Sequence, residues 1–193
     1  MLMNGVGIVG WLHSLACTIG LIAGALMLMR TKGTAAHRKT GWIYVIAMLV
    51  ATITTFAIYH FDIRFAPLRV GPNIFGIFHW ESVATLGFLL LAVFAAPRQA
   101  RAPWAYLHPA SMLATYYMLV GGLINELFVR LTPLRNFAMS QLHGHGNPAQ
   151  SPVVGITQML AMLGFCVLLA WFMTKVALWR RREARTAIAV AAE

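Results

Sequence analysis

Histidine is the residue type whose placement in this sequence best suits chemistry. The chain has seven histidines, and four of them fall inside or at the mouth of long apolar runs: His13, His37, His79 and His108. Ionisable groups are costly inside a bilayer, so by default they mark a functional site there. A neutral imidazole is also the commonest metal ligand and an axial ligand of haem iron.

The depths of these four histidines predict two pairs. With the membrane orientation argued below, His13 and His79 lie near the outer surface, on the first and third runs. His37 and His108 lie near the inner surface, at the start of the second and fourth runs. Two histidine pairs at opposite depths are the arrangement of di-haem transmembrane b-type cytochromes, an architectural analogy. It predicts a protein that binds haem b and transfers electrons in or across the membrane.

Two further residues are predicted to line the inner haem site. Tyr44 lies two helical turns from His37, and Met112 lies one turn beyond His108, so each shares a helix face with its histidine. A methionine at helical spacing is more often core filling. The electron partners of such a protein would be a quinone or other membrane redox subunits.

A second hypothesis is a Zn or Cu site on the outer side. Zinc binds histidine and carboxylate ligands and keeps one position open for water in catalytic sites. The histidines and carboxylates expected on that side include Asp62 and Glu81. The candidate ligands chosen among them are His13, His60, His79, Glu126, His143 and His145. No His-x-x-x-His or comparable spacing supports this alternative.

A third hypothesis is a non-catalytic subunit or assembly factor of a larger membrane complex. The sequence has no nucleophile–base motif, so it leaves open whether the protein is an enzyme. Its basic C-terminal end suits anionic lipids or a protein partner.

One face of the first run has a pattern with two interpretations. Gly10, His13, Cys17, Gly20 and Gly24 recur every three or four residues and therefore share a helix face. Small residues are the usual packing surface between transmembrane helices. The alternative is a glycine-lined groove that holds a flat cofactor against His13.

Composition places these residues in a membrane protein. Of the 193 residues, 60% are hydrophobic and only 10% are charged, whereas a soluble domain is about 25% charged. The net charge of +10 would suggest nucleic acid in a soluble protein. Here the basic residues cluster at the ends of apolar runs, so they indicate membrane topology and lipid contact, and no nucleic-acid partner is expected.

The elements that position the histidines are five apolar runs of about 20 residues, enough to span a bilayer as helices. They predict an all-α membrane protein, a single polytopic domain over 1–193, with spans at about 6–29, 41–60, 75–96, 106–128 and 154–178. The ends assigned to one side hold eleven Lys and Arg residues against four on the other. This bias predicts an outside N-terminus, an inside C-terminus and a basic cytoplasmic tail at 179–193.

Several short motifs resemble a known family. They are Lys32-Gly33-Thr34, His37-Arg38-x-x-Gly41-x-x-Tyr44, Phe78-His79-Trp80 and His108-Pro109-x-x-Met112. Together they resemble the uncharacterised bacterial membrane-protein family numbered 2306 among the domains of unknown function, over about residues 8–128. The resemblance implies a small polytopic protein of a bacterial cytoplasmic membrane, with recurrent histidines, and it implies no particular reaction.

Overall fold

All regular secondary structure in the described part of the chain is helical. The structure, a computed structural model, describes residues 7–58, 77–101, 103–143 and 146–191. Within these residues there is no strand, and five helices are long and apolar enough to cross a membrane. They are α1 (Ile8–Met29), α2 (Ala35–Ile58), α3 (Ile77–Ala95), α4 (Trp104–Arg130) and α6 (Pro152–Ala191). The prediction of an all-α protein with five such helices is therefore confirmed. Helices suit these apolar runs because they satisfy every backbone polar group internally.

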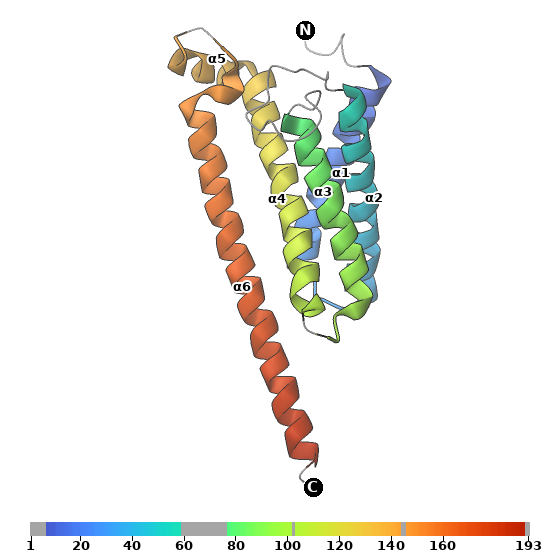
Figure 1. Ribbon diagram of the computed structural model, residues 1–193. Helices are drawn as coiled ribbons and strands as arrows, with labels where there is room; N and C mark the ends of the chain where they lie inside the picture. Colours follow the sequence, from blue (N-terminus) through green and yellow to red (C-terminus); the bar gives the residue numbers. More distant parts are fainter. Residues whose placement is uncertain (1–6, 59–76, 102, 144–145, 192–193) are drawn as a thin grey trace. The chain divides into compact units, whose positions relative to one another are not determined.

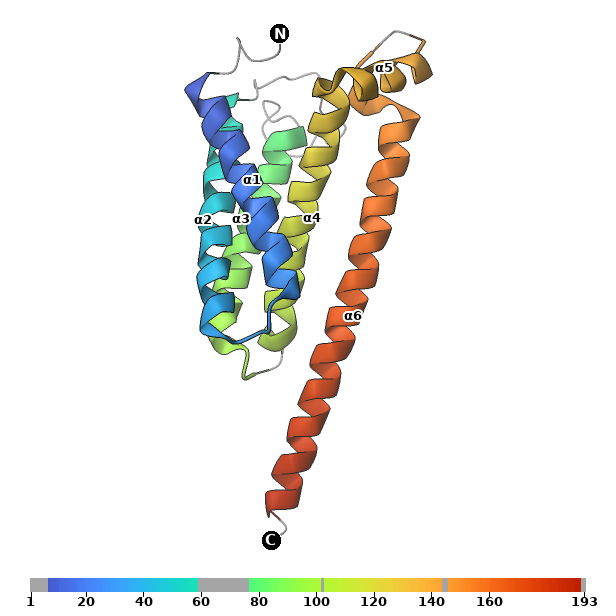
Figure 2. The same cartoon turned by 180° about the vertical axis from the view of Figure 1, so that it is seen from behind.

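The chain divides into two compact units, residues 1–89 and 90–193, and the boundary lies inside α3. In the first unit, α1 and α2 run antiparallel and side by side, as both views show (Figure 1, Figure 2). The buried residues of α1 are small apart from one methionine: Ala16, Gly20, Ala23, Gly24 and Met27. Such residues let helix backbones approach closely. The burial of Gly20 and Gly24 thus favours the packing interpretation of the small-residue face.

The turn between α1 and α2 is set by two adjacent residues. Gly33 has a φ of +80°, a left-handed conformation that costs glycine little. Thr34 follows as the N-cap of α2, because its Oγ1 accepts a hydrogen bond from the His37 backbone N–H at 3.1 Å. The cap starts α2 at Ala35, ahead of the apolar run, and so places His37 in the first turn of the helix.

In the second unit, the short helix α5 (Thr132–Gln141) joins α4 to α6 (Figure 1). Phe128, Ala138 and Val154 form a buried apolar cluster, with one residue from each of these three helices. Farther along, the Gln158 side-chain amide donates to the Gly121 carbonyl oxygen at 2.9 Å and to Asn125 Oδ1 at 3.3 Å. These contacts tie α6 to α4 at one end of both helices.

The last helix is much longer than a membrane requires. It has 40 residues, which at about 1.5 Å per residue gives a length of about 60 Å, against about 30 Å for a hydrocarbon core. Its apolar part ends near Trp179, where Arg180, Arg181 and Arg182 follow. The predicted tail at 179–193 therefore begins as a continuation of α6, which reaches Ala191.

Candidate functional site

His13 has the most completely defined surroundings of the candidate histidines. It lies on α1, and its Nδ1 atom is 3.0 Å from the Ala51 carbonyl oxygen and 3.0 Å from Thr54 Oγ1, both on α2. A carbonyl oxygen only accepts hydrogen bonds, so Nδ1 carries the proton and donates. The Thr54 hydroxyl donates to the Val50 carbonyl at 2.8 Å, which leaves its oxygen able to accept from His13. In this tautomer the lone pair belongs to Nε2.

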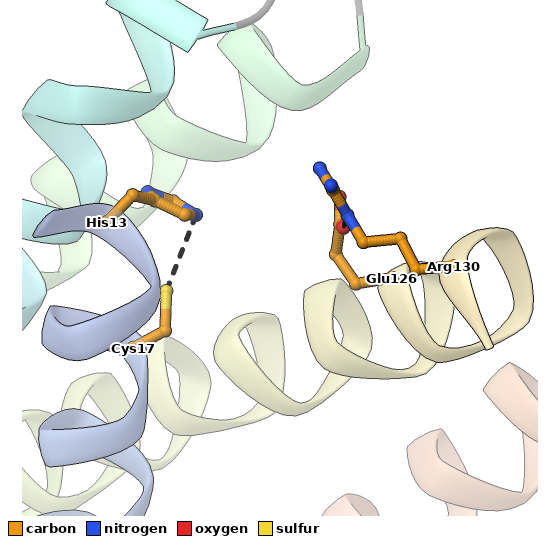
Figure 3. Close-up of polar contacts among 4 residues, drawn as sticks. All are labelled: His13, Cys17, Glu126 and Arg130. Atoms are coloured by element: carbon orange, nitrogen blue, oxygen red, sulfur yellow. Dashed lines mark hydrogen bonds and ion pairs between the residues drawn. The ribbon is translucent and has the colours of Figure 1, made fainter. Parts of the chain in front are cut away.

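The lone pair of His13 faces a thiol. Cys17 follows one turn later on the same helix, and its Sγ atom is 3.5 Å from His13 Nε2, the contact dashed in Figure 3. Because Nε2 is the acceptor nitrogen, the S–H group is the donor in this contact. The pair therefore brings two metal-ligand atom types, imidazole nitrogen and sulfur, together on α1.

His108 repeats the geometry of His13 in the second unit. It lies on α4, and its Nδ1 atom is 2.9 Å from the carbonyl oxygen of Ala92, which is in the part of α3 that belongs to the same unit. Here too the acceptor is a helix carbonyl, so Nδ1 donates and Nε2 holds the lone pair. His13 and His108, two of the four predicted haem ligands, thus have the same tautomer, and in each a helix carbonyl fixes it.

His79 is the most buried of the predicted ligands, with 1% of its surface exposed. It lies in the first turn of α3, and its ring centroid is 5.5 Å from that of Phe56 on α2. Both His13 and His79 belong to the first unit, as the predicted outer pair requires. Whether they ligate one group stays a prediction.

Buried hydroxyls form a feature of the first unit that the sequence analysis missed. They come from α2 and α3: Thr40, Thr52, Thr54, Thr55, Ser82 and Thr85. The hydroxyls of Thr52 and Thr55 donate to carbonyls one turn back in their own helix, at 2.6 and 2.9 Å. Since their protons are used there, the oxygens of Thr52 and Thr55 are left only with the capacity to accept. The recurrence of Thr and Ser inside apolar runs is the signal that would have revealed them.

The predicted inner site has members in both units. His37 is partly buried and Tyr44 has 1% of its surface exposed, both on α2 of the first unit. Met112 is half-buried on α4 beside His108, and its carbonyl accepts a 2.9 Å hydrogen bond from Thr115. The pairing of His37 with His108 accordingly stays a prediction.

The predicted outer metal ligands are described in part. Glu126 forms an ion pair with Arg130 one turn later on α4, also drawn in Figure 3. His143 is exposed, with a φ of +50°. His60 and His145 lie outside the described residues. Within the described ranges, no group of three or more His, Cys, Asp and Glu side chains could hold a metal ion. The Zn or Cu site remains a prediction.

Comparison of the chain with family models, curated proteins and solved structures found no match. The resemblance to the family numbered 2306 is therefore still a prediction that depends on the four short motifs alone.

Proposed function

We propose that this protein is a multi-pass membrane protein whose transmembrane histidines bind haem b for electron transfer. The observation that supports this best is the shared geometry of His13 and His108. Each donates Nδ1–H to a backbone carbonyl of a neighbouring helix. Metal-ligating histidines almost always donate their second ring N–H in this way, which fixes the tautomer, orients the ring and raises its basicity.

In this proposal, haem supplies one-electron redox chemistry when bound, and the chain supplies ligands and surroundings. His13 and His108 would hold haem iron through Nε2, the ring nitrogen that does not donate to a helix carbonyl. The carbonyls of Ala51 and Ala92 hold the rings in place. His79 is the proposed partner ligand of His13, because both belong to the first unit and His79 is buried.

We propose further that the N-terminus lies outside and the C-terminus inside a bacterial cytoplasmic membrane. The uneven distribution of Lys and Arg supports this orientation. A quinone or another redox subunit in the same membrane is the proposed electron partner. Membership of the family numbered 2306 is proposed on the motifs given above.

The test is a visible absorbance spectrum of protein purified in mild detergent, oxidised and then reduced with dithionite. We expect a Soret band and sharp bands in the reduced form. His13→Ala and His108→Ala should each lose part or all of this absorbance. The matched control is His143→Ala, which changes an exposed histidine at a loop. A wild-type spectrum without a Soret band, both as purified and after incubation with haem, would overturn the proposal.

A further inference from the structure

We infer that Cys17 controls haem binding at His13, because its thiol competes with iron for the lone pair of His13 Nε2. The inference rests on the proposed function. It adds Cys17 to the proposed outer site as a third residue, beside His13 and His79, and gives it an effect on haem affinity.

The competition follows from the tautomer. Nδ1 is the protonated nitrogen because it donates to the Ala51 carbonyl, so the proton shared between Nε2 and Sγ comes from the thiol. If His13 held haem iron, it would use the Nε2 lone pair that this S–H group engages. The Cys17 thiol would then have to turn away from the ring.

The ring itself has little freedom to avoid the thiol. Its other nitrogen is anchored to two acceptors on α2, the Ala51 carbonyl and Thr54 Oγ1. Cys17 lies at i+4 on the same helix, where side chains of neighbouring turns meet. Removal of the thiol should consequently remove this donor from Nε2 without displacing the imidazole.

Cys17→Ala removes the competing donor and introduces a residue with the highest helix propensity. A neutral hydrogen bond contributes about 1 kcal/mol, and its loss corresponds to about fivefold tighter haem binding. The sequence supplies a matched control, because the only other cysteine, Cys166, is exposed on α6. Cys166→Ala should leave the dissociation constant unchanged.

The first experiment is an absorbance titration of haem into purified, haem-depleted wild type, Cys17→Ala and Cys166→Ala. Tighter binding by Cys17→Ala alone supports the inference. Equal dissociation constants for wild type and Cys17→Ala would overturn it and leave the proposed function standing. If none of the three proteins binds haem, both fail together.

A second measurement tests the contact without haem. In the Cys166→Ala background a single S–H stretching band remains in the infrared spectrum, and a hydrogen-bonded thiol absorbs at lower frequency than a free one. We expect this band to rise in frequency when His13→Ala is added, and also with the milder His13→Leu. A band that stays fixed in both correctly folded variants would overturn the inference.

Discussion

At the scale of the residue, the chemistry of an imidazole depends on which nitrogen carries the proton. The sequence places His13 and His108 in apolar surroundings but does not specify their tautomers. Those are set by carbonyls 38 and 16 residues away along the chain. A carbonyl inside a helix has a second lone pair beyond the one used by the helix, so it can accept from a neighbouring side chain. The candidate ligands could thus be predicted from the sequence. Which ring nitrogen carries the proton could not, because it depends on contacts between packed helices.

The second acceptor of His13 gives a prediction for the haem site. Thr54→Val removes the hydroxyl that accepts from Nδ1 and keeps a similar shape, while the Ala51 carbonyl remains. Outer partners of metal ligands commonly contribute 10–100-fold to affinity, so we expect about tenfold weaker haem binding by absorbance titration.

The control for this prediction is Thr52→Val. Thr52 is also a buried threonine of α2, and its hydroxyl donates to the Met48 carbonyl of its own helix. This variant should bind haem as the wild type does. Equal affinities for Thr54→Val and wild type would contradict the role assigned to the hydroxyl.

At the scale of the element, the apolar runs predicted five helices because 20 apolar residues in a bilayer leave the backbone few other conformations. The helix ends were less predictable from those runs. α2 begins at Ala35 and α6 begins at Pro152, outside the predicted spans 41–60 and 154–178. The cap at Thr34 and the proline at Pro152 set these ends. Both act locally on the first turn of the helix, and the length of an apolar run does not depend on them.

The cap of α2 is testable on its own. Thr34→Ala removes the oxygen that accepts from the His37 N–H and should lower the free energy of unfolding by about 1 kcal/mol. The measurement is equilibrium unfolding in detergent, followed by circular dichroism. Thr31→Ala is the control, because Thr31 contributes its backbone carbonyl to this turn. Equal stabilities of the two variants would argue against capping by Thr34.

The amide contact between α4 and α6 was not anticipated, although two amides inside apolar runs were a visible signal. Gln158→Leu removes the donor to Gly121 and Asn125. Hydrogen bonds between transmembrane helices contribute about 0.6 kcal/mol on average and about 1.7 at most, so we expect a loss in that range. Gln141→Leu, at an exposed position on α5, is the control. In a double-mutant cycle with Asn125→Leu, zero coupling would exclude the contact as a source of stability.

Lys32, in the turn after α1, is expected to make the stability of the fold depend on pH. Lys32 donates to the carbonyls of Met27 and Leu28, and partial burial lowers the pKa of its ammonium below the usual 10.5. The folded state therefore releases this proton at lower pH than the unfolded state does. Between the two pKa values the unfolded state binds more protons, so stability should rise as pH rises through that window. Unfolding midpoints of wild type and Lys32→Gln should converge toward high pH, and parallel profiles would contradict this prediction.

At the scale of the whole molecule, the candidate residues are divided between two units. His13, His37 and His79 belong to the first unit, and His108 belongs to the second. Contacts inside each unit follow from helix packing that brings sequence-distant positions together. A local sequence pattern predicts which helix carries a candidate ligand. The pairing of His37 with His108 depends instead on how the two units associate, and helical periodicity carries no information about that.

Membrane orientation is a property of the whole chain, and it provides the final prediction. In a background with Cys17→Ala and Cys166→Ala, Gln99→Cys and Gln150→Cys place one exposed thiol at opposite ends of α4. Gln99 lies between Arg98 and Arg101, and basic residues near span ends are retained on the cytoplasmic side. A membrane-impermeant maleimide should therefore label Gln150→Cys in intact cells and Gln99→Cys only after the membrane is opened. The reverse pattern would invert the orientation, and equal labelling of both before opening would mean that α4 does not cross the membrane.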